Sequence, residues 1–209
     1  MLTATYTLVA LSVEQASVRV SLQALQKLLQ TSLVHQSALT PAQVSGTCEA
    51  VKRIVDSSHW RKLERFLIPA IRKATTGADK LLQDLDELGR AAADAVGVLV
   101  IRLGSMAVDS HSAVAQFCAA LEAFCSATME RLEREEKDLF PLARAVISGE
   151  AWFSIANEML AQDAYLQDSR PVRSGPAPAA VAQNADDYFA EDARQVPFAI
   201  SPYAGNFVH

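Results

Sequence analysis

Apolar residues recur at helical spacing through most of this chain, and this periodicity is the feature that most restricts its fold. In the first segment they are separated by three, four or seven residues, which places them on one face of a helix over about residues 5–32. A helix with one apolar face has to bury that face against other helices or a sheet. This stripe consists of Leu8, Leu11, Val18, Leu22, Leu25 and Leu29.

Three further long segments repeat the pattern. Thr40 and Pro41 supply an N-cap and a first-turn proline for a second helix, which runs to about residue 75. A third helix begins after Gly77 and ends at Gly104, and a fourth, the longest, carries Pro141 near its C-terminal end. Their expected inward residues are Val51, Val55, Leu63, Phe66 and Ala70 on the second, Leu81, Leu85, Leu88, Ala92, Val96 and Leu99 on the third, and Phe117, Leu121, Phe124, Leu139 and Leu142 on the fourth.

These helices predict an all-α fold, an antiparallel four-helix bundle with a short capping helix at its C-terminal end. The cap is indicated by the helical spacing of Trp152, Ile155 and Met159. We therefore expect a bundle domain over residues 1–167, followed over residues 168–209 by a Pro/Ala-rich linker and an irregular tail. Because the tail contains several aromatic residues, it is suited to pack onto the bundle or onto an unknown protein partner; a loosely held terminus is the alternative.

Charge and cysteine content exclude several classes of protein. A net charge of -5 and a pI near 5.4 give no basic surface for nucleic acid or an anionic membrane. Cys118 and Cys125 lie seven residues apart, about 10 Å along one helix, which is too far for a disulfide. The most apolar interior stretch, residues 91–108, contains Asp94 and Arg102, so we expect no membrane span. The composition favours a reduced, cytoplasmic location.

Polar residues interrupt the apolar stripes at a few positions. Gln15 on the first helix and His59 on the second both fall on inward faces. The stripe of the fourth helix passes through Arg131 and Glu135, four residues apart, and Gly89 takes the comparable place on the third. In an antiparallel bundle these positions can share one depth, which predicts a buried polar cluster beside a glycine-sized gap. An exposed ion pair on a charged helix face, and a histidine with a purely structural place in the core, are the alternatives.

Two stretches of the chain resemble a known family. Residues 133–143 (Glu-Arg-Glu-Glu-Lys-Asp-Leu-Phe-Pro-Leu-Ala), followed by Trp152, resemble the last helix of hemerythrin-like (HHE cation-binding) domains, and residues 58–69 (Ser-His-Trp-Arg-Lys-Leu-Glu-Arg-Phe-Leu-Ile-Pro) resemble their second helix. The likeness covers about residues 5–162. It implies a four-helix bundle whose relatives hold two irons through histidines and carboxylates and bind oxygen or sense redox state and iron.

Position by position, the resemblance leaves an incomplete ligand set. His59 matches a family histidine, and Glu135 matches the carboxylate one turn after the family histidine of the fourth helix. That histidine is replaced by Arg131, the first-helix histidine by Gln15 and the third-helix histidine by Gly89. The resemblance therefore implies a degenerate metal site with a polar cluster in place of the missing ligands.

The charge of the replacements argues against a di-iron centre. Leu63 stands where the resemblance implies a bridging carboxylate, with Glu64 beside it, so the remaining candidate ligands are His59, Glu64 and Glu135. Two cations in a low-dielectric interior need several neutral imidazoles and deprotonated carboxylates. Arg131 instead brings a fixed positive charge to the place of the metal. We expect no cofactor; a single iron or zinc ion held by the three candidates is the alternative.

The function that follows is that of a hemerythrin-like protein with a largely lost di-iron site, acting as a non-enzymatic binding, scaffold or regulatory module. The alternative is a metal- or oxygen-sensing protein with a mononuclear site. An enzyme is the third possibility, but the sequence contains no nucleophile with an adjacent base, no phosphate-binding glycine loop and no complete metal set.

Overall fold

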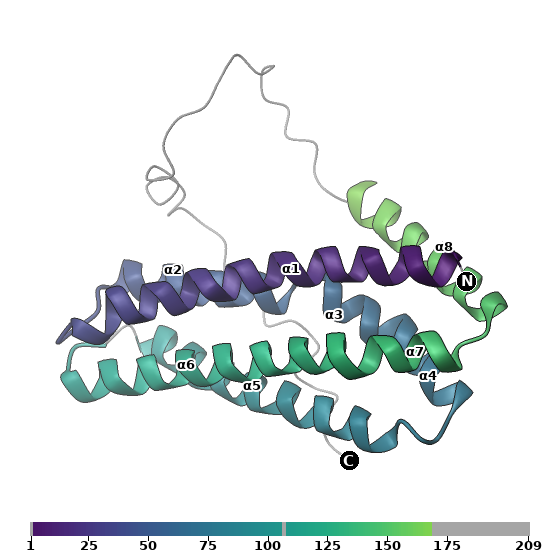
Figure 1. The fold of residues 1–209 in the computed structure, drawn as a ribbon. Helices are drawn as coiled ribbons and strands as arrows, with labels where there is room; N and C mark the ends of the chain where they lie inside the picture. The colour runs from purple at the N-terminus through teal and green to yellow at the C-terminus, as the bar shows by residue number, and fades with distance from the viewer. Residues whose placement is uncertain (1, 106–107, 169–209) are drawn as a thin grey trace, which may run out of the picture. The chain divides into compact units, whose positions relative to one another are not determined.

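The computed structural model describes residues 2–105 and 108–168, and its regular elements are helical throughout this part of the chain (Figure 1). The all-α class is therefore confirmed, whereas the predicted linker and tail lie outside the described residues from 169 onward. The elements in chain order are α1 (Leu2–Thr31), a short 3-10 turn η1 (Leu33–His35), α2 (Pro41–Val55), α3 (Ser58–Lys62), the π-helical turn η2 (Leu63–Leu67), α4 (Ile68–Ala74), α5 (Asp79–Ser105), α6 (His111–Arg134), the π-helical turn η3 (Glu135–Leu139), α7 (Phe140–Val146) and α8 (Gly149–Asp168).

The predicted second helix is interrupted, which corrects the expectation of one continuous element. Asp56 closes α2, and Ser57 adopts an extended conformation (φ -62°, ψ 149°) as the N-cap of α3. Val55, expected to face inward, is 46% exposed, and Ile54 is buried in its place. The break changes the direction in which the following side chains point, and His59, Leu63 and Phe66 are buried after it.

The other helices begin and end close to the predicted residues. On α5, however, Leu82 and Ala95 are buried, whereas four residues expected to face inward are only partly buried: Leu81, Leu88, Ala92 and Val96. Thr40 forms a capping box with Gln43 at the start of α2, as its position before a first-turn proline predicts. The fourth predicted helix is continuous from α6 through η3 to α7. The predicted cap is longer than expected, since α8 has 20 residues, and its Trp152, Ile155 and Met159 are buried as predicted.

The long helices lie roughly side by side. In Figure 1, α1 and the α6–η3–α7 stretch run along each other, α5 follows α6 on its other side, and α8 crosses α1 near the N-terminal end. The α2 helix contacts both α1 and α5.

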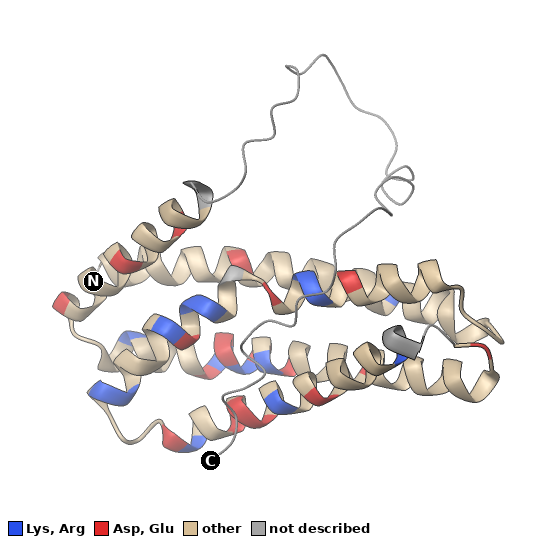
Figure 2. Ribbon diagram, turned by 180° about the vertical axis from the view of Figure 1, so that it is seen from behind, with Lys and Arg blue, Asp and Glu red and all other residues tan. Residues whose placement is uncertain are grey.

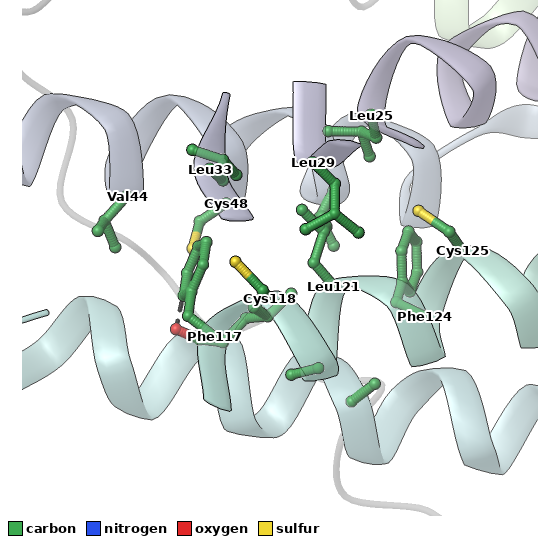
Figure 3. Close-up of a cluster of buried hydrophobic side chains, with 14 of the residues drawn as sticks. Leu25, Leu29, Leu33, Val44, Cys48, Phe117, Cys118, Leu121, Phe124 and Cys125 are labelled. Atoms are coloured by element: carbon green, nitrogen blue, oxygen red, sulfur yellow. Dashed lines mark hydrogen bonds between the residues drawn. The ribbon is translucent and has the colours of Figure 1, made fainter. Parts of the chain in front are cut away.

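The buried apolar residues form two separate clusters rather than one continuous core. The first apolar cluster joins α1, α2, α5 and α6. Figure 3 shows Leu25 and Leu29 of α1 on one side of it, with Leu121 and Phe124 of α6 on the other. The second apolar cluster joins the start of α1 to η2, α4, α5, η3, α7 and α8. The first includes Val18, Leu22, Leu25, Leu29, Ile54, Leu99, Phe117, Leu121, Phe124 and Leu132, and the second includes Leu11, Leu63, Leu67, Ile71, Leu85, Leu139, Trp152, Ile155 and Met159.

All three cysteines are buried members of the first apolar cluster, and none of them forms a disulfide (Figure 3). Burial, helped by the nearby Glu49, raises the pKa of the Cys48 thiol to about 11. Burial and Glu122 raise the pKa of Cys125 to about 11, and the same causes raise the pKa of Cys118. Since a raised pKa keeps a thiol protonated and unreactive, these cysteines serve as small core residues.

One helical stretch of the described chain, His111–Val146, is long and apolar enough to cross a membrane by length and composition. Half of its apolar window is buried inside the fold. The core helix of a soluble protein meets the same criterion, so the expectation that the chain has no membrane span stays a prediction.

Candidate functional site

A buried polar layer separates the two apolar clusters. It consists of Gln15, His59, Arg131 and Glu135, and three of these four side chains are at most 2% exposed. Along the chain, each of those three falls between a residue of one cluster and a residue of the other. Gln15 lies between Leu11 and Val18, His59 between Ile54 and Leu63, and Glu135 between Leu132 and Leu139.

Two π-helical turns position acidic residues at this layer. Glu135 opens η3, and its backbone carbonyl accepts a hydrogen bond from the N–H of Phe140, five residues along the chain. Glu64 lies in η2, the corresponding turn of the other stretch. Each turn precedes a proline, Pro69 or Pro141, that has no N–H and whose ring crowds the carbonyl four residues before it. The wider π turn relieves this conflict, and such turns are frequent at functional sites.

Glu135 is the centre of the layer. Its side chain is fully buried, and both carboxylate oxygens accept hydrogen bonds. Oε1 lies 3.0 Å from Nε of Arg131, while Oε2 lies 2.7 Å from Nε2 of His59 and 3.4 Å from Nε2 of Gln15. The Gln15 amide also donates to the carbonyl of Leu132 at 2.8 Å, which fixes its orientation. Several donors thus compensate a charge that would otherwise be very costly to bury.

Arg131 links this buried carboxylate to a second, outer one. Its Nη2 lies 3.2 Å from Oε1 of Glu64, whereas its Nε holds Glu135. The Arg131 side chain is 11% exposed and that of Glu64 is 58% exposed, so the guanidinium bridges from the interior to the surface. Being planar, with donors on several sides, it can hold two carboxylates at once.

Gly89 on α5 makes room for this guanidinium. A Cβ atom built at position 89 would lie 2.6 Å from Nη1 of Arg131, well inside van der Waals contact. Arg131 is the only residue such a Cβ would approach closely among those described. The glycine-sized gap predicted from the sequence is therefore present, and the arginine fills it.

His59 completes the layer with one ring nitrogen bonded and one without a partner. Because Glu135 also accepts from Arg131, it acts as an acceptor toward His59, whose Nε2 then carries the proton. Its buried Nδ1 has no hydrogen-bond partner among the described residues. The neighbouring Trp60 packs edge-on against the His59 ring, with centroids 5.9 Å apart, and touches both apolar clusters.

A second polar cluster, which the sequence did not predict, ties α8 to the bundle. The ammonium group of Lys62 lies 2.5 Å from Oε1 of Glu14 on α1 and 2.8 Å from Oδ2 of Asp163 on α8. Burial alone would lower the pKa of Lys62, but the hydrogen bonds and charges of Asp163 and Glu14 outweigh it and raise the pKa. The available signal was weak: Glu14 adjoins Gln15, and Lys62 follows the inward His59 by three residues.

The structure brings together all six residues singled out in the sequence, but it does not arrange them as ligands. Within residues 2–105 and 108–168, no group of three or more His, Cys, Asp and Glu side chains is placed to hold a metal ion. His59 and Glu135 bond to each other, and Glu64 is reached only through Arg131. The donor set fits a metal pair poorly, because the guanidinium carries its own positive charge between the two carboxylates.

Comparisons with known proteins found no match to this chain. No protein family, no curated protein and no solved structure is significantly similar to it. The resemblance to hemerythrin-like domains therefore depends on the residues and geometry described above.

Proposed function

We propose that this chain is a hemerythrin-like four-helix bundle in which an arginine has replaced the metal, and that it acts as a metal-free binding or regulatory module rather than an enzyme. The observation that carries the proposal is the position of Arg131. Its guanidinium fills the space beside Gly89 and pairs with Glu135 and Glu64. These are positions where the resemblance implies a metal ligand or its neighbour.

The chemistry of the polar layer supports this proposal. In a di-iron bundle, metal cations neutralise the inward carboxylates. Here the guanidinium of Arg131 does so, and it remains protonated at physiological pH. The amide of Gln15 donates to Glu135, whereas a metal-binding imidazole would offer a lone pair. Arg131 and Gln15 therefore both donate hydrogen bonds to the buried carboxylate of Glu135, which needs such donors when no metal ion is bound.

A variant that restores the family's histidines tests the proposal. We expect Gln15→His, Gly89→His and Arg131→His together to confer binding of Fe²⁺ or Zn²⁺, because a histidine at each of these three positions would join His59 and Glu135. The wild-type chain should bind neither ion. Isothermal titration with each metal ion, after circular dichroism has shown that both proteins are helical, measures the difference.

The matched control adds His59→Ala to the restored variant. This change should abolish the acquired binding if His59 supplies a ligand. A folded restored variant that binds no metal would show that these positions do not surround a metal site. Metal binding by the wild-type chain that disappears on His59→Ala would instead support a mononuclear sensor that uses His59, Glu64 and Glu135.

A further inference from the structure

The outer face of α1 carries an apolar stripe that no described residue covers. Its large members are Leu2, Tyr6, Val9, Val13 and Val20, and they are between 54% and 74% exposed. Ala16, which is also exposed, lies on the same face between Val13 and Val20. The residues are separated by four, three, four, three and four positions, which places them on one face about half a turn from the buried stripe.

No charged side chain interrupts this outer stripe. Up to residue 26 the only charged residues of α1 are Glu14 and Arg19, and both are engaged in ion pairs elsewhere. Glu14 binds Lys62, and Arg19 binds Glu136 at 2.7 Å. The helix that leaves the N-terminus is accordingly mostly tan in Figure 2. A helix that is apolar on opposite faces is normally covered on both.

The spacing of the outer stripe indicates that a helix covers it. Alternating steps of three and four residues are the pattern by which two helices interlock their side chains along a shared seam. The stripe from Leu2 to Val20 is about 27 Å long at a rise of about 1.5 Å per residue. That length corresponds to nearly three heptads.

The order of the side chains suits a second copy of α1 as the partner helix. The series of steps reads the same in both directions, as an alternation of four- and three-residue steps does, so an antiparallel copy of α1 can meet it in register across a two-fold axis. This pairing sets Leu2 opposite Val20, Tyr6 opposite Ala16, and Val9 opposite Val13 of the second copy. The largest side chain then faces the smallest, as interdigitated packing requires. The absence of charge also makes the face complementary to itself.

We propose that the chain forms a two-fold dimer through antiparallel pairing of the outer stripes of two α1 helices. A strip about 27 Å long and about 10 Å wide is smaller than the roughly 800 Å² that each partner contributes to a standard interface. The dimer is therefore reversible and depends on protein concentration. A membrane surface fits the stripe less well, because α1 has only Arg19 and Lys27 to contact anionic headgroups.

Sedimentation velocity of the full chain over a wide range of concentrations tests the dimer. The wild type should shift from monomer to dimer, and Val13→Glu should raise the dissociation constant about tenfold or more by placing a charge in the seam. The matched control is Ile101→Glu on α5, where the side chain is 72% exposed, compared with 66% for Val13. This control should dimerise like the wild type. A wild type that is monomeric throughout would overturn the proposal, as would a monomer that binds phosphatidylserine vesicles through the stripe.

Cysteine cross-linking tests the antiparallel register. A mixture of Val9→Cys and Val13→Cys chains should form disulfide-linked dimers under mild oxidation, because positions 9 and 13 face each other. Each variant alone should form few disulfide-linked dimers. The native cysteines should not interfere, since all three are buried. Efficient cross-linking of either variant with itself would indicate a parallel pair and overturn the proposed register.

Discussion

Replacing Arg131 with leucine is expected to lower the free energy of unfolding by about 3–5 kcal/mol. The change leaves Glu135, a fully buried carboxylate, with only His59 and Gln15 as donors and no compensating charge. Urea denaturation followed by circular dichroism measures the loss.

The matched control for this change is Arg134→Leu on the same helix. Arg134 bonds to Asp84 at 2.6 Å, but its side chain is 38% exposed, and exposed pairs contribute about 1 kcal/mol or less. Combining Arg131→Met with Glu135→Gln should recover part of the loss, because the charge is then removed from both partners. Equal, small effects of Arg131→Leu and Arg134→Leu would show that the buried ion pair does not stabilise the fold.

Replacing Trp152 with alanine should destabilise the chain by about 3–5 kcal/mol, the usual loss for a large buried aromatic side chain. Trp152 is 2% exposed and joins α8 to the second apolar cluster. We expect α8 to separate from the bundle first, because without Trp152 it is held mainly by two smaller buried side chains, Ile155 and Met159, and by the partly exposed ion pair between Asp163 and Lys62. Thermal unfolding and hydrogen exchange along α8 measure both effects.

The adjacent residue provides the control for this second change. Phe153 is 62% exposed, so Phe153→Ala should alter stability by no more than about 0.5 kcal/mol. If Trp152→Ala and Phe153→Ala changed the stability equally little, α8 would not dock through Trp152.

The polar layer could be predicted because polar residues on an apolar stripe are conspicuous. Gln15, His59 and Glu135 each occupy a position where helical spacing requires an apolar residue, and all three are buried. Gly89 was recognised by its matching depth, and the structure places it against Arg131 as expected. The inward position of these polar residues was thus readable from periodicity, whereas periodicity did not show whether they hold a metal.

Other features could not be read from periodicity, for identifiable reasons. The break at Asp56 and Ser57 shifts the buried residue from Val55 to Ile54, and a pattern tolerant of both three- and four-residue steps does not detect such a shift. The cluster around Lys62 depends on α8 covering it, which only the tertiary structure reveals. The four-helix topology and the family membership remain proposals, since helical periodicity does not specify how helices connect in space.

The metal content of the wild-type chain tests the central claim most directly. The protein, purified without chelators from iron-supplemented cells, should contain far less than one iron or zinc per chain by elemental analysis, and its aerobic absorption spectrum should lack oxo-bridged iron bands. This result is expected because Arg131 already provides the positive charge beside Glu135 and Glu64. About two irons per chain with such bands would contradict the claim, because a di-iron centre would then occupy the place assigned to the arginine.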